Sequence, residues 1–240
     1  MNSPLKFSIV IPAHNEERYL EDTLSHLAAL SYPVGNYETI VVENGSNDRT
    51  LEVARKFEND HVLILQSGKG VSKAKNVGID HLSPASDWVI FLDADTILEK
   101  DFLNELNAFL SRPNSFTVGT VTLRPSPETL KAKIWFKIYD LGHWLTSTSY
   151  SIKMVKRSLF LPAQADPPLR FDENLVTAED LHMIQQARAH GKFFFLRTKS
   201  VLTSTRRFEK LGWWYILFYW TFVAILPEKW QRHFSYDVVR

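Results

Sequence analysis

The chain has 240 residues, with 28 Lys and Arg against 27 Asp and Glu, so its formal net charge is +1. This balance lacks the broad basic surface of a general nucleic-acid binder, and no nucleic-acid partner is expected. Hydrophobic residues make up 45% of the chain and cysteine is absent. The composition is that of a folded globular protein without disulfides, thiolate catalysis or cysteine-bound zinc.

Short apolar segments alternate with helical segments through the first half of the chain. The strand candidates are Phe7–Ile11, Tyr37–Glu43, Val62–Gln66 and Trp88–Asp93. They are apolar on both faces, as buried parallel strands are. Helices are expected between them, over Glu16–Leu30, Asp48–Phe57 and Val71–Leu82. This repetition predicts right-handed crossovers and a mixed, mostly parallel α/β sheet flanked by helices.

The pattern changes after residue 110. Further strands are expected over Phe116–Leu123, Tyr150–Lys156 and Phe193–Leu196. Further helices are expected over Glu128–Leu145 and Ala178–His190. We therefore expect one mixed α/β domain over residues 1–205, followed by a basic, aromatic extension over residues 206–240.

The apolar run at the N-terminus, Phe7–Ile11, is shorter than a secretory signal segment, and no cleavage-site pattern follows it. A cytoplasmic location is therefore expected.

Residues 192–240 carry nine Lys or Arg and three Asp or Glu, and Leu211–Pro227 is uncharged and rich in Trp, Tyr and Phe. At about 1.5 Å per residue this uncharged stretch reaches roughly 26 Å, short of the hydrocarbon core of about 30 Å. Its basic flanks favour an interfacial helix, with peripheral membrane contact through residues 206–232. A helix docked on the protein's own core or in a homodimer interface is the alternative.

Two aspartates, Asp93 and Asp95, follow the buried strand that ends in Phe91-Leu92. At the carboxyl edge of a sheet they could face a divalent cation and a diphosphate, because hard oxygen ligands suit Mg²⁺ or Mn²⁺. A pair of aspartates that only forms the turn is the alternative.

Polar turns also follow the first two strands, at Pro12–Glu16 and Glu43–Asp48. Because the carboxyl ends of parallel strands meet at one edge, both turns are expected beside the two aspartates. The Asn44 amide offers a donor and an acceptor suited to a base edge, while Ser46 and Asp48 can cap the next helix. Capping without any ligand is the alternative for each turn.

Two helix starts carry charged residues. Gly68–Gly78 combines a glycine-flexed loop with lysines that could hold an anion, or that only form a solvated face. Glu179 and Asp180 follow Thr177, a natural N-cap. These acidic residues either complement the helix dipole or supply a carboxylate that takes a proton from an attacking hydroxyl.

In this order the motifs resemble those of the family-two glycosyltransferases, from Phe7 to Leu196. The matching segments are the P-x-x-N-E turn at Pro12–Glu16, a variant of V-D-D-G-S-x-D at Val42–Asp48, G-x-x-x-A-x-N-x-G at Gly70–Gly78, D-x-D at Asp93–Asp95, F-D-E at Phe171–Glu173, and E-D at Glu179–Asp180 with a glycine eleven residues on, Gly191.

The resemblance implies the GT-A fold and an inverting, metal-dependent transfer of a sugar from a nucleoside-diphosphate sugar. The acceptor would be a hydroxyl or phosphate, carried by a sugar, a glycolipid or another lipid-linked molecule. Residues 1–110 would form the nucleotide-binding half and residues 111–205 the acceptor half.

The resemblance also implies roles for individual residues. Asp180 would be the catalytic base and Glu179 its orienting neighbour or an acceptor contact. Asp95 would bind Mn²⁺ or Mg²⁺, with Asp93 contacting the ribose or the water shell of the metal. The implied nucleotide-sugar-binding residues are Pro12, Ala13, Asn15, Glu16, Glu43, Asn44, Ser46, Lys73, Asn76, Asp93 and Ala94.

Two other functions are compatible with such a sheet: a nucleotidyltransferase, which would release pyrophosphate, and a non-catalytic scaffold that binds nucleotide-sugars. The turn after the first strand is not the Gly- and Arg-rich loop that nucleotidyltransferases carry there. A scaffold has no use for charged groups such as Asp93, Asp95 and Asp180 at the sheet edge. Both observations favour the glycosyltransferase.

Overall fold

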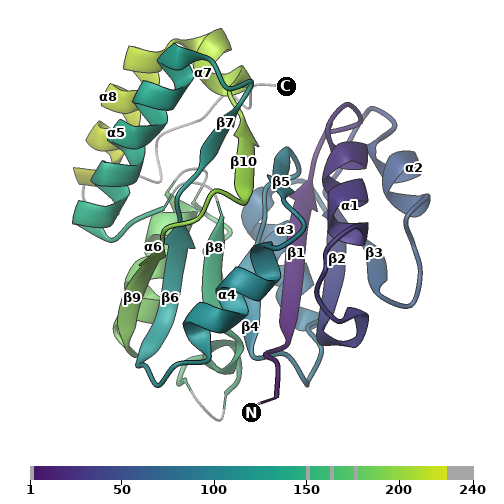
Figure 1. The fold of residues 1–240 in the computed structure, drawn as a ribbon. Coiled ribbons are helices and arrows are strands. Elements are labelled where there is room, and N and C mark those ends of the chain that lie inside the picture. The colour runs from purple at the N-terminus through teal and green to yellow at the C-terminus, as the bar shows by residue number, and fades with distance from the viewer. Residues whose placement is uncertain (1–2, 150–151, 163–164, 176–177, 226–240) are drawn as a thin grey trace.

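The computed structural model describes residues 3–149, 152–162, 165–175 and 178–225. A seven-stranded sheet of order β3-β2-β1-β4-β8-β6-β9 forms the body of the molecule, and a three-stranded sheet of order β5-β10-β7 lies beside it (Figure 1). In the large sheet β8 pairs antiparallel with β4 and β6, and the other neighbours pair in parallel. The strands are β1 (Phe7–Ala13), β2 (Tyr37–Glu43), β3 (Val62–Gln66), β4 (Trp88–Phe91), β5 (Thr96–Leu98), β6 (Phe116–Val121), β7 (Arg124–Ser126), β8 (Lys153–Lys156), β9 (Lys192–Leu196) and β10 (Val201–Ser204).

Helices cover both faces of the large sheet. Side chains of β1 alternate between two hydrophobic cores, with Phe7, Ile9 and Ile11 in the core beneath α1 and α4, and Val10 in the core beneath α3 and α6. The helices are α1 (Leu20–Ala28), α2 (Thr50–Arg55), α3 (Val71–Asp80), α4 (Phe102–Leu110), α5 (Leu130–Thr146), α6 (Glu179–Arg188), α7 (Arg206–Leu211) and α8 (Trp213–Ile225), with short 3₁₀ turns at Val34–Asn36 and Arg157–Phe160.

The structure confirms the mixed, mostly parallel α/β fold expected from the sequence, with two differences. Val62–Gln66 was expected to be buried on both faces, but β3 is an edge strand and Leu63 is 40% exposed. The elements β5, α4, β7 and β10 were not expected, because the short strands among them pair only with partners distant in the sequence. Thr177, the expected N-cap of α6, lies outside the described residues.

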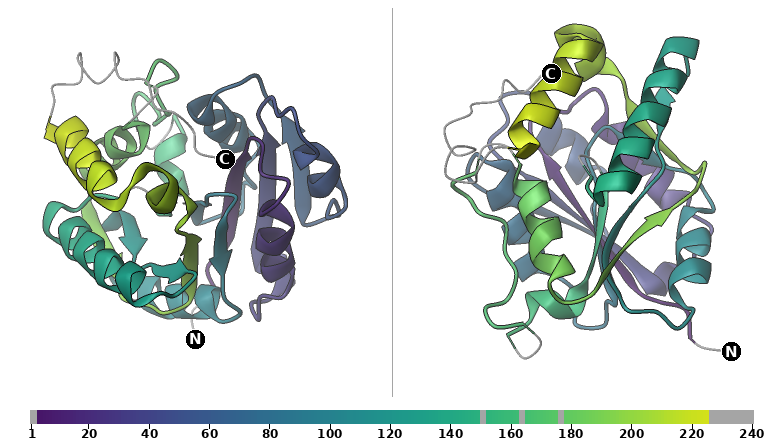
Figure 2. Two further views of the ribbon diagram at one scale, coloured as in Figure 1. Left: turned by 90° about the horizontal axis from the view of Figure 1, so that it is seen from above. Right: turned by 90° about the vertical axis from the view of Figure 1, so that its left-hand side faces the viewer.

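A further layer, formed by α5, α7 and α8, stands over the carboxyl end of the large sheet (Figures 1 and 2). Its small core contains Trp135 and Phe136 of α5 and Trp213 of α8. The Trp135 ring lies 4.7 Å from the Trp214 ring, so α5 and α8 lie side by side. None of the helices in the described part of the chain has the length and apolar character needed to cross a membrane.

Gly78 sets how closely α3 approaches the sheet. A Cβ at this position would lie 2.4 Å from Cγ1 of Val10 on β1, which is closer than any real contact. The glycine therefore lets α3 rest directly on the central strand. The same helix carries Lys75 and Asn76 one turn earlier, so this contact also fixes their height above the sheet edge.

We expect Gly78→Ala to lower the free energy of unfolding by about 1–3 kcal/mol, because the added methyl group overpacks the α3–β1 contact. Gly142→Ala in α5 is the control, since its Cβ would meet no atom within 4 Å. That substitution should raise stability by about 0.5–1 kcal/mol, as alanine does in a helix interior. Urea unfolding measures both; a stabilised Gly78→Ala variant would contradict the close approach.

Candidate active site

The turns after β1 and β2 are joined into one unit at the carboxyl edge of the sheet. The N–H of Asn15 donates to Ser46 Oγ at 3.0 Å, and the N–H of Asn47 donates to Asn15 Oδ1 at 2.7 Å. Asn15 adopts a left-handed backbone with φ of 54°, which asparagine tolerates better than most residues. Asn15 and Ser46, both expected at the site, therefore shape the edge through their side chains.

Glu43 ends β2 and Asn44 follows it; both are buried, with different roles. Glu43 accepts hydrogen bonds from the N–H of Ser46 and from Gln66. Burial alone would raise the pKa of Glu43, but the hydrogen bonds from Ser46 outweigh it and lower the pKa. Its carboxylate thus stabilises the turn after β2. The Asn44 Oδ1 atom, in contrast, is buried without a hydrogen-bond partner among the described residues.

The D-x-D segment follows β4 at the same edge. Ala94 is buried and its carbonyl accepts from Thr23 Oγ1 at 2.8 Å, which anchors the segment to α1. Asp93 and Asp95 both line an adjacent cavity. Asp95 pairs with Arg206 of α7, with 3.1 Å between Oδ2 and Nε. Burial, opposed by this guanidinium, raises the pKa of Asp95.

A buried cluster of charges brings three distant elements together. Asp180, at the start of α6, forms an ion pair with Lys75 of α3, with 2.6 Å between Nζ and Oδ1. Its other oxygen, Oδ2, pairs with Lys153 of β8. Lys75 also lies 3.1 Å from Glu179 Oε1, and its ammonium is 4.8 Å from the centre of the Phe171 ring. The lysine side chains are 2% and 1% exposed, so these charges interact with little screening by water.

The pKa values of the two adjacent carboxyl groups of this cluster are shifted in opposite directions. Burial would raise the pKa of Asp180, but the charges of Lys153 and Lys75 outweigh it and lower the pKa. Burial, reinforced by the charge of Asp180, raises the pKa of Glu179. Asp180 is therefore ionised at neutral pH. Burial also lowers the pKa of Lys153, so that this ammonium depends on Asp180 for its charge.

Asn76 and Lys73, both expected to bind the nucleotide-sugar, have different partners in the structure. The Asn76 amide donates to the Phe171 carbonyl at 2.9 Å and to Glu173 at 3.0 Å, and it accepts the N–H of Phe171 at 2.9 Å. It therefore holds the F-D-E segment against α3. Lys73 is exposed and its ammonium lies over Gly68, at the loop that precedes the helix.

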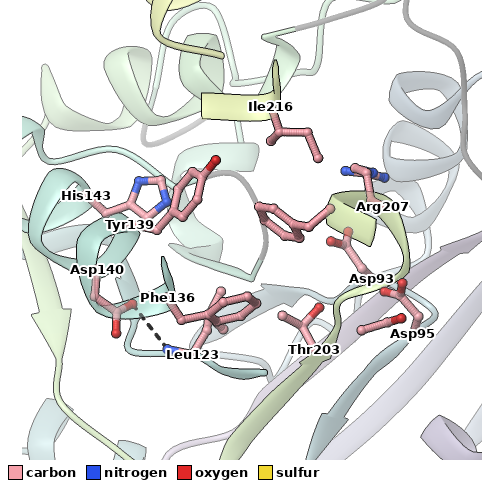
Figure 3. A pocket seen from close by; sticks show the side chains of 12 residues that line it. Asp93, Asp95, Leu123, Phe136, Tyr139, Asp140, His143, Thr203, Arg207 and Ile216 are labelled. Atoms are coloured by element: carbon pink, nitrogen blue, oxygen red, sulfur yellow. Dashed lines mark hydrogen bonds between the residues drawn. The ribbon is translucent and has the colours of Figure 1, made fainter. Parts of the chain in front are cut away.

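A cavity extends from Asp93 and Asp95 to the inner face of α5 (Figure 3). Burial raises the pKa of Asp140 to about 7, and the N–H of Leu123 stabilises its carboxylate in part. Burial and the charge of Lys153 lower the pKa of His143 to about 4, so this imidazole is neutral at physiological pH. The cavity is lined by Asp93, Asp95, Leu123, Phe136, Tyr139, Asp140, His143, Thr203, Ser204, Arg207, Phe208 and Ile216.

Comparison with known proteins identifies the family of the chain. The model of Glycosyl transferase family 2 matches residues 8–162, which include β1 to β8 and the D-x-D segment. The chain belongs to glycosyl transferase family 2. Its resemblance to that family, inferred from the motifs, is thereby confirmed.

The family 2 chain also resembles individual proteins. It is 25% identical over 212 residues to poly(ribitol-phosphate) beta-N-acetylglucosaminyltransferase TarS of Staphylococcus aureus strain Mu50, covering 85% of this chain and 36% of TarS. It is 39% identical over 100 residues to glycosyltransferase AglE of Haloferax volcanii, covering 40% of this chain and 32% of AglE. The chain thus spans about a third of the length of these curated relatives.

Solved structures confirm the GT-A fold. The crystal structure of S. aureus TarS in complex with UDP-GlcNAc matches with a TM-score of 0.68 at 22% identity, over 84% of this chain and 59% of that one. The mannosyltransferase PcManGT from Pyrobaculum calidifontis, in complex with GDP-Man and Mn²⁺, matches with a TM-score of 0.62 at 18% identity, over 84% and 58% of the two chains.

The carboxylates of this family 2 chain fit a divalent cation that binds together with a nucleotide. Within the described ranges, no group of three or more His, Cys, Asp or Glu side chains forms a metal cage. Mg²⁺ rarely needs one, because it is usually held by one or two carboxylates together with water and substrate phosphates. Asp93 and Asp95 supply hard oxygen ligands of this kind.

Three cations that pair with these carboxylates were not among the expected site residues: Lys75, Lys153 and Arg206. Lys75 carried a signal, because it lies between Ala74 and Gly78 on the inward face of α3. Lys153 is flanked by apolar residues in a short strand, and Arg206 was assigned to the basic extension. Neither position has a local pattern that indicates which carboxylate it meets.

We expect Asp180→Asn to lower the free energy of unfolding by about 3–5 kcal/mol, because it leaves Lys153 buried without its carboxylate. Adding Lys153→Met should then restore at least about 1 kcal/mol, since the unpaired ammonium is removed. Lys156→Met, an exposed lysine on the same strand, is the control and should restore nothing. Urea unfolding measures the series; equal effects of the two methionine substitutions would contradict the pairing.

Proposed function

We propose that the chain is an inverting glycosyltransferase that moves a sugar from a nucleoside-diphosphate sugar to a hydroxyl or phosphate acceptor. The observation that carries the proposal is the ionised carboxylate of Asp180, buried between two lysines on which Asp93 also acts electrostatically. In-line displacement at the anomeric carbon needs an acceptor deprotonated on one side and a diphosphate stabilised on the other. Asp180 would supply the first function, and Asp93 with Asp95 would supply the second.

Asp180 acts as the base in this proposal, and the lysines adjust its proton affinity. In the structure their charges lower the pKa of Asp180, which makes it a weak base. Asp93 also acts electrostatically on both lysines, so a diphosphate bound beside Asp93 would lie within their electrostatic field. A diphosphate entering that edge shares the lysine charge and raises the pKa of Asp180 towards the range that suits a general base.

Asp93 and Asp95 would hold Mg²⁺ or Mn²⁺, which supplies charge neutralisation at the leaving diphosphate. Asn44 would contact the base, because its buried Oδ1 is an acceptor without a partner. Pro12, Ala13, Asn15 and Ser46 would form the wall of the nucleotide pocket. The solved relatives of similar fold hold UDP-GlcNAc and GDP-Man, which supports a nucleoside-diphosphate sugar without selecting the base.

We expect one of UDP, GDP, CDP and dTDP to raise the melting temperature in the presence of Mn²⁺ by about 5–10 °C at 100 times its dissociation constant. Asp180→Asn should keep this nucleotide-dependent stabilisation, while kcat falls at least about 100-fold. Glu179→Gln should affect kcat less.

Three outcomes would contradict the proposal. Release of pyrophosphate in place of a nucleoside diphosphate would indicate a nucleotidyltransferase. Nucleotide binding without any turnover would indicate a scaffold. Unchanged turnover in Asp180→Asn would remove this residue from the mechanism. Assays are run well below the melting temperature of the variant, because Asp180→Asn is expected to be less stable.

The surface formed by α5 and α8 supports a lipid-linked acceptor. Among the described residues, ten of the twelve exposed large hydrophobic side chains belong to these two helices. Such an exposed apolar surface in a protein marks an interaction site. The ten residues are Leu130, Ile134, Ile138, Leu141, Trp144, Leu145, Trp214, Tyr215, Phe218 and Phe222.

The charges around this surface favour an anionic membrane as its partner. Lys131, Lys133 and Lys137 of α5 and Lys210 of α7 are exposed beside the apolar residues. Basic side chains near an apolar helical face bind anionic headgroups while the apolar face enters the interface. The cavity that ends at Asp93 lies on the inner side of the same helices, so a lipid-linked acceptor at the membrane would be close to the donor.

We expect the double variant Leu145→Glu and Phe218→Glu to lose at least about tenfold in binding to phosphatidylglycerol vesicles, because two side chains that are each 67% exposed no longer enter the interface. Val34→Glu, which changes an exposed apolar residue away from α5 and α8, is the control. Co-sedimentation measures binding. Unchanged sedimentation of the double variant would contradict the proposal, and a loss of dimer in its place would indicate that this face joins two copies.

A further inference from the structure

Arg206 connects the C-terminal helices to the carboxyl edge of the large sheet, beside Glu16 and Asp95. Its Nη2 donates to Glu16 Oε1 at 2.5 Å, and its Nε lies 3.1 Å from Asp95 Oδ2. Its guanidinium carbon is 4.3 Å from the centre of the Tyr19 ring. The Arg206 side chain is 15% exposed, and the carboxylates of Glu16 and Asp95 are 11% and 15% exposed. One partly buried cation thus bridges two residues expected to bind the donor.

The negative charge at this edge exceeds what Arg206 neutralises. Glu16, Asp93 and Asp95 act on one another electrostatically, while Arg206 pairs with Glu16 and Asp95 and the charge of Arg207 also acts on Asp95. The second carboxylate oxygen of Glu16, Oε2, is buried and has no hydrogen-bond partner among the described residues. A buried carboxylate oxygen without a donor is costly, which indicates that the edge is completed by a further positively charged or hydrogen-bonding group.

We propose that Arg206 is a donor-binding residue that occupies the cation position while the site is empty and turns to the diphosphate when the nucleoside-diphosphate sugar binds. This inference rests on the proposed function, because it takes a nucleoside diphosphate as the ligand. Arg206 shares Asp95 with the proposed metal site, and two positive groups at one carboxylate repel each other.

A bound diphosphate changes the balance of charge at Arg206. Its negative oxygens compensate both a divalent cation on Asp95 and the guanidinium beside it. The planar fork of an arginine matches phosphate oxygens, to which it can donate two parallel hydrogen bonds. Arg206 therefore weakens metal binding when no nucleotide is present, and it strengthens nucleotide binding when the metal is there.

The two roles predict effects of opposite sign in one variant. Arg206→Gln should bind Mn²⁺ alone several-fold more tightly than the unmodified chain does, because the cation that pairs with Asp95 is removed. The same variant should bind the stabilising nucleoside diphosphate in the presence of Mn²⁺ about tenfold more weakly, as expected for the loss of a charge-assisted hydrogen bond. Calorimetric titration measures both affinities without any acceptor or turnover.

Two matched variants separate this role from general effects of charge or folding. Arg206→Lys keeps the charge but not the fork, so its nucleotide affinity should fall between those of the unmodified chain and Arg206→Gln. Arg49→Gln removes an arginine that pairs with Glu17 at 3.2 Å on the surface, where its side chain is 76% exposed. It should leave both affinities unchanged.

Equal losses of Mn²⁺ and nucleotide affinity in Arg206→Gln would show a merely structural residue and overturn the inference, as would no change in either affinity. If the unmodified chain binds none of the four nucleoside diphosphates with Mn²⁺, the proposed function fails. The titration with Mn²⁺ alone still tests Arg206 in that case, because a variant that gains no affinity for the ion contradicts the competition.

Discussion

Lys75, Lys153 and Asp180 come from α3, β8 and α6, and their charges are stable in the interior only while these three elements keep their positions. An isolated buried ion is costly, whereas paired ions in good geometry offset much of that cost. The cluster therefore ties the parallel half of the sheet to the later strands. It also explains why α3 needs Gly78, since a helix held farther from β1 would carry Lys75 away from Asp180.

The carboxyl edge of the sheet beside Glu16 and Asp95 also depends on buried ion pairs, with Arg206 as the cation. Asp95 and Glu16 are largely buried, and the guanidinium that pairs with them comes from the start of α7, far along the chain. The C-terminal helices are thus joined to the carboxyl edge of the sheet by these ion pairs. Because α7 leads through Gly212 directly into α8, the residue that pairs with Asp95 lies at one end of the same layer that carries the exposed apolar side chains.

The helix α5 has two apolar faces, one packed inside the protein and one exposed at its surface. Trp135 and Phe136 form its inward face and pack against α7 and α8. Leu130, Ile134 and Leu141 lie on its outward face and are exposed. An amphipathic helix at the surface of a domain normally exposes a polar face, so the outward apolar residues of α5 indicate a contact beyond those that the described residues make.

The sequence by itself determined the sheet and the position of the D-x-D segment. Buried strands, helix periods and the residues of the βα turns are local patterns, and parallel strands bring their carboxyl ends to one edge whatever follows. Asp93, Asp95 and Asn44 are expected at this edge for this reason, whereas the role of Asp180 is implied by the resemblance to the family. The tertiary structure alone decided which cations meet these groups. Lys75, Lys153 and Arg206 find their carboxylates across 105, 27 and 111 residues of chain, and pairings at such distances depend on the packing of whole elements, which no local pattern encodes.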